Sequence, residues 1–474
     1  MLNSNKQPQK KATSLKLDKQ LSYNEVIEYL ESKWSVAPDK TLKRFKAIDT
    51  ALGQISKVTP SILVTGTNGK SLTTDFAAKL LKEEGLNVGT LSSPHILTYN
   101  ERISINNEIL SNKKFTDIAN LIINTIEQAQ INASSAEILT AMALQSFVEA
   151  KVDVAVLETW ELGAWDPVTL CSPKVVAITR VTSDTLVADS PEFVEFVKQI
   201  ANIATKDNFV ISADQSKLNL QTIQAEILKN GAKWAMPIRK LAVLPYPFEQ
   251  LHGRCAALAE RAVQIFIENF ITNNAIVVST SLLIHPKGQR GRPSLEAKRQ
   301  SELNPRRTIE QFWKECLTTI PGRFQILDKE KPTILLDTAN NVDALTNTLL
   351  GARLINYQKN FKGLTLIIGC ENGEIHRPEF LKQLRYFFKK VSGQVIFCPI
   401  KKSKDNHDSD EKWNIEAITN DVKNIKVKAQ STKSFSEAFE LAKKSVDERY
   451  GMIMITGSKN IVSEYWNTKG IKKL

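Results

Sequence analysis

Short apolar runs alternate with helical stretches along the first half of the chain. Between two such runs, residues 136–150 have the apolar spacing of a helix. The runs have the length and composition of buried strands, and they lie at residues 62–65, 153–158, 175–179 and 209–212. Alternation of strands and helices is typical of a parallel sheet with helices on both faces, so we predict an α/β fold with an N-terminal sheet of the P-loop type.

A second series of the same kind begins after Pro321. A helical segment such as 379–390 separates its apolar runs, which lie at residues 333–337, 364–369, 395–399 and 452–456. This repetition predicts a second, smaller α/β domain of the Rossmann-like type.

The segment between the two series differs in composition from both. Residues 286–315 are basic, contain proline and have few apolar residues before Ile309. The N-terminus is polar and basic and lacks the apolar stretch of a secretory signal. We therefore predict four regions: a basic disordered arm at 1–20, an N-terminal domain at 21–285, a basic linker or insertion at 286–318, and a C-terminal domain at 319–474.

Composition limits the class of protein. With 474 residues the chain can form two or three cores, and its 42% hydrophobic and 24% charged residues are usual for soluble globular proteins. No apolar run reaches the length of about 18 residues that spans a bilayer, so we expect no membrane association. The five cysteines include no pair at CxxC spacing, which argues against a zinc site or a disulfide framework and favours the cytoplasm. We ascribe the net charge of +12 to a general bias toward lysine and expect a monomer that does not bind nucleic acid.

One segment has the pattern of a phosphate-binding loop. Residues 62–81, ILVTGTNGKSLTTDFAAKLL, combine a strand, a glycine turn, a lysine, hydroxyl groups and a helix. Glycines allow backbone amides to approach phosphate oxygens, and the helix N-terminus adds its positive dipole end. Val64 stands where the usual Walker pattern has its first glycine, so the match is to a shorter variant. The predicted nucleotide ligands here are Gly66, Thr67, Asn68, Gly69, Lys70 and Ser71.

Six motifs in order resemble one known family. TGTNGK at 65–70 resembles the ATP loop of the Mur ligases, and SSPHILTYNERI at 92–103 resembles a loop of the folylpolyglutamate and dihydrofolate synthases. The other four motifs are found at 135–158, at PGRF in 321–324, at DTANNVDA in 337–344 and at TGSKNIVSE in 456–464. The chain is identified as a divergent member of the dihydrofolate synthase/folylpolyglutamate synthase family of the Mur ligase superfamily.

This resemblance implies an ATP-dependent ligase that uses Mg²⁺. ATP would phosphorylate the carboxylate of a folate-type acid, dihydropteroate and/or tetrahydrofolate, and the amine of L-glutamate would attack the acyl phosphate. Position by position, Ser93 and Glu158 match metal ligands, while Arg323 and Asp337 match residues that close the C-terminal domain over ATP. Asn340 stands where the family has a histidine and is also expected to contact ATP. Lys70, Glu158 and Arg323 are the implied catalytic residues.

Several positions depart from the family pattern. Thr185 stands where a histidine metal ligand is expected, and no lysine stands in register in QIANI at 199–203, where relatives have a modified lysine. Trp160 and Glu161 interrupt a glycine-rich turn, and HGRCA at 252–256 keeps only its histidine. These departures leave open a second hypothesis, an inactive homologue that retains the fold and nucleotide binding as a scaffold or regulator. A ligase for another acid is a third, against which the NERI segment argues.

Overall fold

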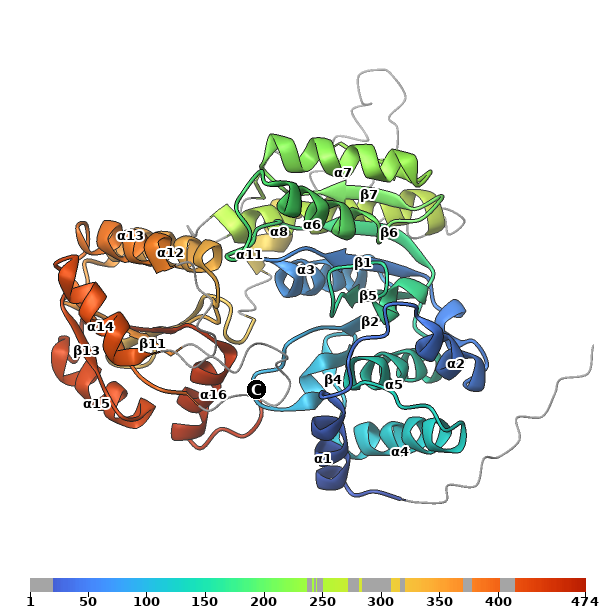
Figure 1. Ribbon diagram of the computed structural model, residues 1–474, viewed down its shortest axis with the longest axis horizontal. Coiled ribbons are helices and arrows are strands. Elements are labelled where there is room, and N and C mark those ends of the chain that lie inside the picture. The colour runs from blue at the N-terminus through green and yellow to red at the C-terminus, as the bar shows by residue number, and fades with distance from the viewer. Residues whose placement is uncertain are drawn as a thin grey trace, which may run out of the picture.

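Two sheets, one in each half of the chain, organise the molecule (Figure 1). The computed structural model describes residues 20–236, 241–242, 244, 250–271, 281–283, 308–315, 320–369, 377–400 and 414–474. The predicted arm at 1–20 therefore lies outside the described residues apart from Gln20, and so does most of the predicted linker at 286–318.

The N-terminal sheet has eight strands in the order β4-β3-β2-β5-β1-β6-β7-β8. β3 pairs antiparallel with β2 and with β4, and the other neighbours are parallel. The strands span Ser61–Thr65 (β1), Val88–Leu91 (β2), Ile103–Ile105 (β3), Glu108–Ile109 (β4), Val154–Glu158 (β5), Pro173–Ile178 (β6), Phe209–Ser212 (β7) and Lys233–Trp234 (β8). All four strands predicted in this half are present within two residues of the expected ends.

Helices cover both faces of this sheet because its central strands are buried on both sides. Alternate residues of β1 enter different cores: Ile62 and Val64 face one, and Leu63 faces the other. The first core contains α3 (Lys70–Glu83), α8 (Gln250–Phe266) and α11 (Ile309–Glu315). The second contains α1 (Tyr23–Lys33), α2 (Lys43–Ala51), α4 (Asn112–Gln128), α5 (Ser135–Glu149), α6 (Pro191–Ala201) and α7 (Lys217–Lys229).

The C-terminal sheet has six strands in the order β13-β12-β11-β14-β10-β9, with only β9 antiparallel to its neighbour. The strands span Gln325–Leu327 (β9), Thr333–Leu336 (β10), Leu364–Ile368 (β11), Gly393–Phe397 (β12), Ala429–Ser431 (β13) and Met452–Thr456 (β14). One face packs on α12 (Val342–Lys359), α13 (Arg377–Phe388) and α14 (Ile415–Asn424), and the other on α15 (Phe435–Ser445) and α16 (Lys459–Thr468). The predicted second α/β domain is confirmed.

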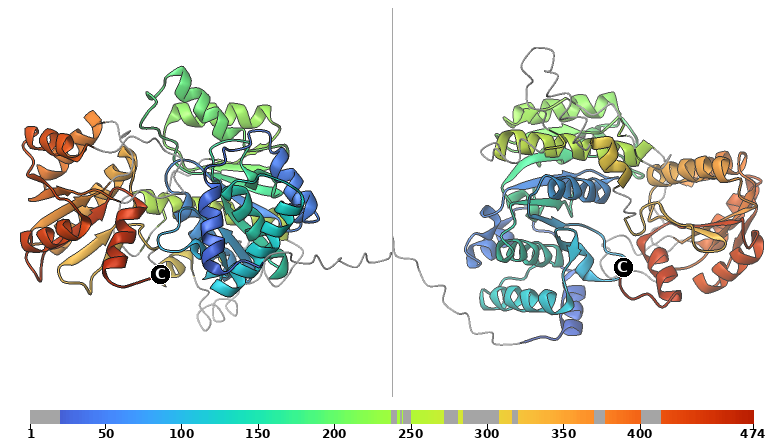
Figure 2. Two further views of the ribbon diagram at one scale, coloured as in Figure 1. Left: turned by 60° about the horizontal axis from the view of Figure 1, so that its bottom comes forward. Right: turned by 180° about the vertical axis from the view of Figure 1, so that it is seen from behind.

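The domains lie side by side in every view, the C-terminal one coloured orange to red (Figure 2). Ile96 of the N-terminal half is buried in the C-terminal core with Leu336 and Val462. Within the predicted linker, α11 buries Phe312 and Trp313 in the same core as α3, so this part of the segment packs on the N-terminal domain. No helix among the described residues combines the length and the apolarity needed to cross a membrane.

Candidate active site

A cavity of about 530 Å³ lies between the two domains. Its position follows from the topology, because ligands of parallel α/β sheets bind beyond the carboxyl ends of the strands. β1 leads into the predicted phosphate loop, and its neighbour β5 ends at Glu158. Most of the predicted site residues line the cavity together: Thr67, Asn68, Gly69, Lys70, Ser71, Ser93, Glu158, Arg323, Asp337 and Asn340.

The phosphate loop is held against the loop that follows β6. The amides of Thr67 and Asn68 both donate to the carbonyl oxygen of Arg180, at 2.8 and 3.4 Å. Gly69, the N-cap of α3, has φ 94°, and α3 has no side-chain cap. Since the first amides of a helix have no partner within the helix, the first turn of α3 offers donors to an anion in the cavity.

Gly66 is not among the residues that line the cavity, and its position requires glycine for two reasons. Its φ is +121°, and a Cβ at this position would lie 2.3 Å from Thr179 Oγ1 and 3.0 Å from Arg180 O. The close approach brings the phosphate loop onto the residues that follow β6. Gly66 therefore acts on the shape of the phosphate loop rather than by direct contact with the cavity.

We predict that Gly66→Ala destabilises the protein by about 1–3 kcal/mol, because the methyl group overpacks a rigid contact in a left-handed backbone. Gly85→Ala is the matched control: Gly85 has φ +84°, but no atom lies within 4 Å of its added Cβ. Thermal unfolding of both variants measures the difference. Equal losses would show that backbone conformation alone, without the contact to Thr179, explains the need for Gly66.

Lys70, Ser71 and Glu158 form the centre of the site. Lys70 Nζ donates to Gly66 O at 3.0 Å, and Ser71 Oγ lies 3.2 Å from Glu158 Oε1. The amide of Ser93 donates to the other oxygen, Glu158 Oε2, at 3.1 Å. Burial lowers the pKa of Lys70 and raises the pKa of Glu158, while their mutual attraction opposes both shifts. The site therefore keeps a buried ammonium group and a buried carboxyl group in electrostatic contact.

The donor set at Glu158 fits a hard cation. The Ser71 hydroxyl contacts the Glu158 carboxylate, and Ser93, whose amide donates to the same carboxylate, also lines the cavity. Carboxylate and hydroxyl oxygens are ligands that suit Mg²⁺. Ser93 Oγ also accepts a hydrogen bond from Arg102 Nη1 at 2.9 Å, so one of its lone pairs is already used. In the described part of the chain, no three His, Cys, Asp or Glu side chains gather as a metal cluster. An ion here would be held by one carboxylate, hydroxyls and the phosphates of a nucleotide.

The C-terminal domain contributes a guanidinium group from the PGRF segment. Arg323 Nη2 lies 3.4 Å from Ser71 Oγ, and its Nη1 donates to Thr338 Oγ1. Burial also lowers the pKa of His252, to about 4; a hydrogen bond with the Arg323 backbone opposes that shift, and the Arg323 charge adds to it. His252, on α8 of the N-terminal domain, is therefore neutral at physiological pH. Arg323 is the cation by which the C-terminal domain contacts Ser71 of the phosphate loop.

Asp337 and Asn340 line the cavity from the same domain but differ in their surroundings. Asp337 is buried and accepts hydrogen bonds from Phe324 N and Ala339 N, both at 2.8 Å, and from Thr348 Oγ1 at 3.0 Å. Burial raises its pKa, and these hydrogen bonds oppose that shift. Asn340 is exposed and accepts from Asn341 Nδ2 at 3.3 Å. Asp337 thus braces the loop that presents Arg323, while Asn340 is open to a ligand.

Three indoles line one end of the cavity: Trp34, Trp160 and Trp165. The Arg102 guanidinium lies 5.2 Å from the Trp160 ring and 5.5 Å from the Trp34 ring. Trp160 Nε1 donates to Thr140 Oγ1 at 2.9 Å, which sets the orientation of the ring. The tryptophan that interrupts the expected glycine turn therefore forms part of an aromatic wall.

Neither the missing histidine ligand nor the missing lysine has a substitute from its own segment in the cavity lining. Thr185 is exposed and shares a hydrogen bond of 3.2 Å with the Ser183 hydroxyl. Lys198 pairs with Glu195 at 3.4 Å, and neither Lys198 nor Lys206 lines the cavity. Lys459 does line it, from the first turn of α16. Lys459 belongs to the TGSKNIVSE motif at 456–464, and no role was predicted for it from the sequence.

Comparison with known proteins agrees with this geometry. No family model matches the chain. The dihydrofolate synthase/folylpolyglutamate synthase of Bacillus subtilis is 27% identical over 342 residues, which cover 69% of this chain and 76% of that protein. The structure of Mycobacterium tuberculosis folylpolyglutamate synthase complexed with ADP aligns with a TM-score of 0.73 and 20% identity, over 94% of this chain and 98% of the other.

A bifunctional folylpolyglutamate synthase/dihydrofolate synthase with Mn, AMPPNP and L-glutamate bound aligns over 96% of this chain and all of its own, with a TM-score of 0.69 and 20% identity. The sequence relative supports homology, and the two structures show that the fold is shared across both domains. The chain is therefore a divergent homologue of the dihydrofolate synthase/folylpolyglutamate synthases of the Mur ligase superfamily.

Proposed function

We propose that the protein is an ATP-dependent ligase that joins L-glutamate to the carboxyl group of a folate-type acid, dihydropteroate and/or tetrahydrofolate. One observation supports this most: Lys70, Glu158 and Arg323 come from separate elements and both domains, yet they line a single cavity. A ligase that activates a carboxylate must hold two anions together, and convergent cations beside a metal-binding carboxylate meet that need.

The reaction divides into two displacements. A carboxylate oxygen of the acid bonds to the γ-phosphorus of ATP, and the bond to ADP breaks. The amine of glutamate then bonds to the acyl carbon and loses a proton, while phosphate leaves. Negative charge develops on the departing ADP in the first step, and on the acyl oxygen and the departing phosphate in the second, so both steps gain from cationic groups held in place.

This chain's own groups serve the first displacement. Lys70 and the first turn of α3 neutralise the phosphates, and Arg323 brings a second cation from the C-terminal domain to the same place. Glu158, Ser71 and Ser93 would hold Mg²⁺, which would supply charge neutralisation for the β- and γ-phosphates. Because Arg323 belongs to the other domain, its contact with Ser71 requires the two domains to be closed.

The aromatic wall supports a planar acid as the substrate. Trp34, Trp160 and Trp165 line the cavity, as do the carboxylates of Asp39 and Glu137. Flat rings stack on such surfaces, and carboxylates accept hydrogen bonds from ring amino groups. The relatives' names indicate folate-type acids, which have both features. We further propose that the protein acts in the cytoplasm as a monomer and does not bind nucleic acid.

The inactive alternative has no support in the relatives named above, which are synthases. The decisive measurement is phosphate release by the purified protein with Mg·ATP, L-glutamate and either dihydropteroate or tetrahydrofolate. We expect release that requires both the acid and glutamate, with a product that is heavier by one glutamyl residue in mass spectrometry. Nucleotide binding without acid-dependent release would contradict the ligase and support a scaffold.

A further inference from the structure

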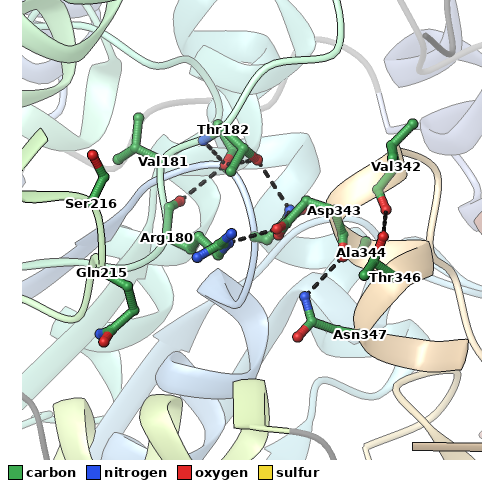
Figure 3. A network of polar contacts seen from close by, with 12 residues as sticks. Arg180, Val181, Thr182, Gln215, Ser216, Val342, Asp343, Ala344, Thr346 and Asn347 are labelled. Carbon is green, nitrogen blue, oxygen red and sulfur yellow. Dashed lines mark hydrogen bonds and ion pairs between the residues drawn. The ribbon is translucent and has the colours of Figure 1, made fainter. Parts of the chain in front are cut away.

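A polar network joins the phosphate loop to the first turn of α12, across the boundary between the domains (Figure 3). We call it the interdomain contact. On the N-terminal side it comprises Asn68, Arg180 and Asp184, and on the C-terminal side Asn341, Val342 and Asp343.

Asp343 is the centre of the interdomain contact. Its Oδ1 accepts from Arg180 Nε at 2.7 Å, and its Oδ2 accepts from Asn68 Nδ2 at 2.8 Å. Asn68 and Asn341 pair through their amides, at 2.8 and 3.1 Å. Each carboxylate oxygen of Asp343 thus accepts a hydrogen bond from a different residue of the N-terminal domain.

The first turn of α12 is capped partly by the other domain. Asn341, its N-cap, accepts from Ala344 N at 2.9 Å, and Asp184 Oδ2 accepts from Val342 N at the same distance. An anion at a helix N-terminus is stabilised by the helix dipole. Asp184 therefore helps to hold the C-terminal domain in place.

Arg180 connects this contact directly to the shape of the phosphate loop. Its carbonyl accepts from Thr67 N, from Thr67 Oγ1 at 3.0 Å and from Asn68 N, while its side chain binds Asp343. A shift of the C-terminal domain would thus act on the residue that holds the loop. Figure 3 shows the Arg180 side chain extended toward Asp343.

The charge of Asp343 poses a problem for anion binding. A carboxylate hydrogen-bonded to the phosphate loop repels the phosphates that the loop is shaped to receive, unless a cation offsets it. Arg180 provides that cation, and the side chains of the pair are 34% and 15% exposed, so solvent screens them only in part. Arg254 and Asp214 also act electrostatically on this region. Because their charges are opposite, their effects on a bound phosphate oppose each other.

We propose that Arg180 and Asp343 are positioning residues: the pair holds the C-terminal domain against the phosphate loop, and Arg180 cancels the repulsion between Asp343 and bound phosphates. Neither side chain lines the cavity, so both act through Asn68 and the loop. Only the predicted effect on kcat rests on the proposed function; the predicted effects on Mg·ADP affinity and on stability do not require catalysis.

The test compares Arg180→Ala, Asp343→Asn and the double variant, with Mg·ADP affinity measured by calorimetry. Arg180→Ala leaves an uncompensated anion, so its dissociation constant should rise about threefold to tenfold. Asp343→Asn leaves an uncompensated cation and should bind Mg·ADP more tightly than the wild type does. The double variant should return close to the wild-type affinity, whereas kcat should fall in all three because the domains are held less firmly.

A merely structural role would weaken Mg·ADP binding in both single variants, and that result would overturn the charge argument. The matched control is Arg377→Ala, which breaks an Arg–Asp pair of 2.5 Å with Asp421 inside the C-terminal domain and should change neither affinity nor kcat. A double-mutant cycle on thermal unfolding measures the coupling energy between Arg180 and Asp343 without any ligand. A coupling energy indistinguishable from zero would contradict the proposal that the pair holds the domains together. If the wild type bound no Mg·ADP, both the proposed function and the charge argument would be wrong. The double-mutant cycle on thermal unfolding would still decide whether Arg180 and Asp343 join the domains.

Discussion

Lys70→Ala is expected to lower kcat/KM for ATP by about 10²- to 10³-fold, the range found when one preorganised charge-stabilising donor is removed. Lys70 stands at the first position of α3, and its ammonium group lies against Gly66 O, within the loop that would surround the phosphates. No other lysine from the N-terminal domain is among the described residues that line the cavity. Steady-state kinetics with saturating acid and glutamate, together with calorimetric binding of Mg·ADP, measures the effect.

The matched control for this variant is Lys82→Ala on the same helix. Lys82 is exposed and donates to Asn106 O at 2.9 Å, far from the cavity lining. Its removal should leave kcat/KM unchanged. If Lys70→Ala retained wild-type kinetics while circular dichroism confirmed its fold, the assignment of the phosphate loop would have to be abandoned.

Periodicity predicted most of the fold because the strands are buried on both faces. Every residue of β5 and β14 is buried, and all but the last of each, Glu158 and Thr456, are apolar; such runs stand out in a sequence. The antiparallel strands β3 and β4 were not predicted, since they have three and two residues and each includes a polar one. Strands this short leave no pattern that distinguishes them from a loop.

The phosphate loop was predictable for a different reason: its parts are adjacent in sequence. Gly66, Gly69 and Lys70 act within one turn, and the strand and the helix that flank them are visible in the pattern. The convergence of Glu158 and Arg323 on this turn depends on strand order and on domain closure. Only the resemblance to a family, and not the residue pattern itself, placed them in one site.

The partners of individual side chains could not be predicted from spacing. Asn68 was predicted as a nucleotide ligand, and in the structure its amide binds Asn341 and Asp343 while the residue still lines the cavity. Trp160 was read as an intrusion into a glycine turn, yet it packs beside Trp34 in an ordered wall. Such contacts join residues more than a hundred positions apart, and no local signal specifies them.

Glu158→Gln tests the metal site, and we expect it to lower kcat by about 10- to 100-fold, as the loss of a ligand or its close partner commonly does. The substitution keeps the size and the hydrogen-bonding oxygen but removes the negative charge that would bind Mg²⁺. Ser71 and Ser93 can then offer only neutral oxygens. The Mg²⁺ concentration for half-maximal activity should therefore rise, and this rise separates a lost ligand from a general loss of activity.

The control is Glu149→Gln, which changes the same chemical group at the surface, where Glu149 pairs with Lys114. It should leave the Mg²⁺ dependence as it is in the wild type. Magnesium titrations of phosphate release compare the three proteins at fixed ATP. The metal site would be contradicted if Glu158→Gln lowered kcat but left the half-maximal Mg²⁺ concentration unchanged. The Glu158 carboxylate would then act on Lys70, because these two buried groups attract each other and that attraction also requires the negative charge.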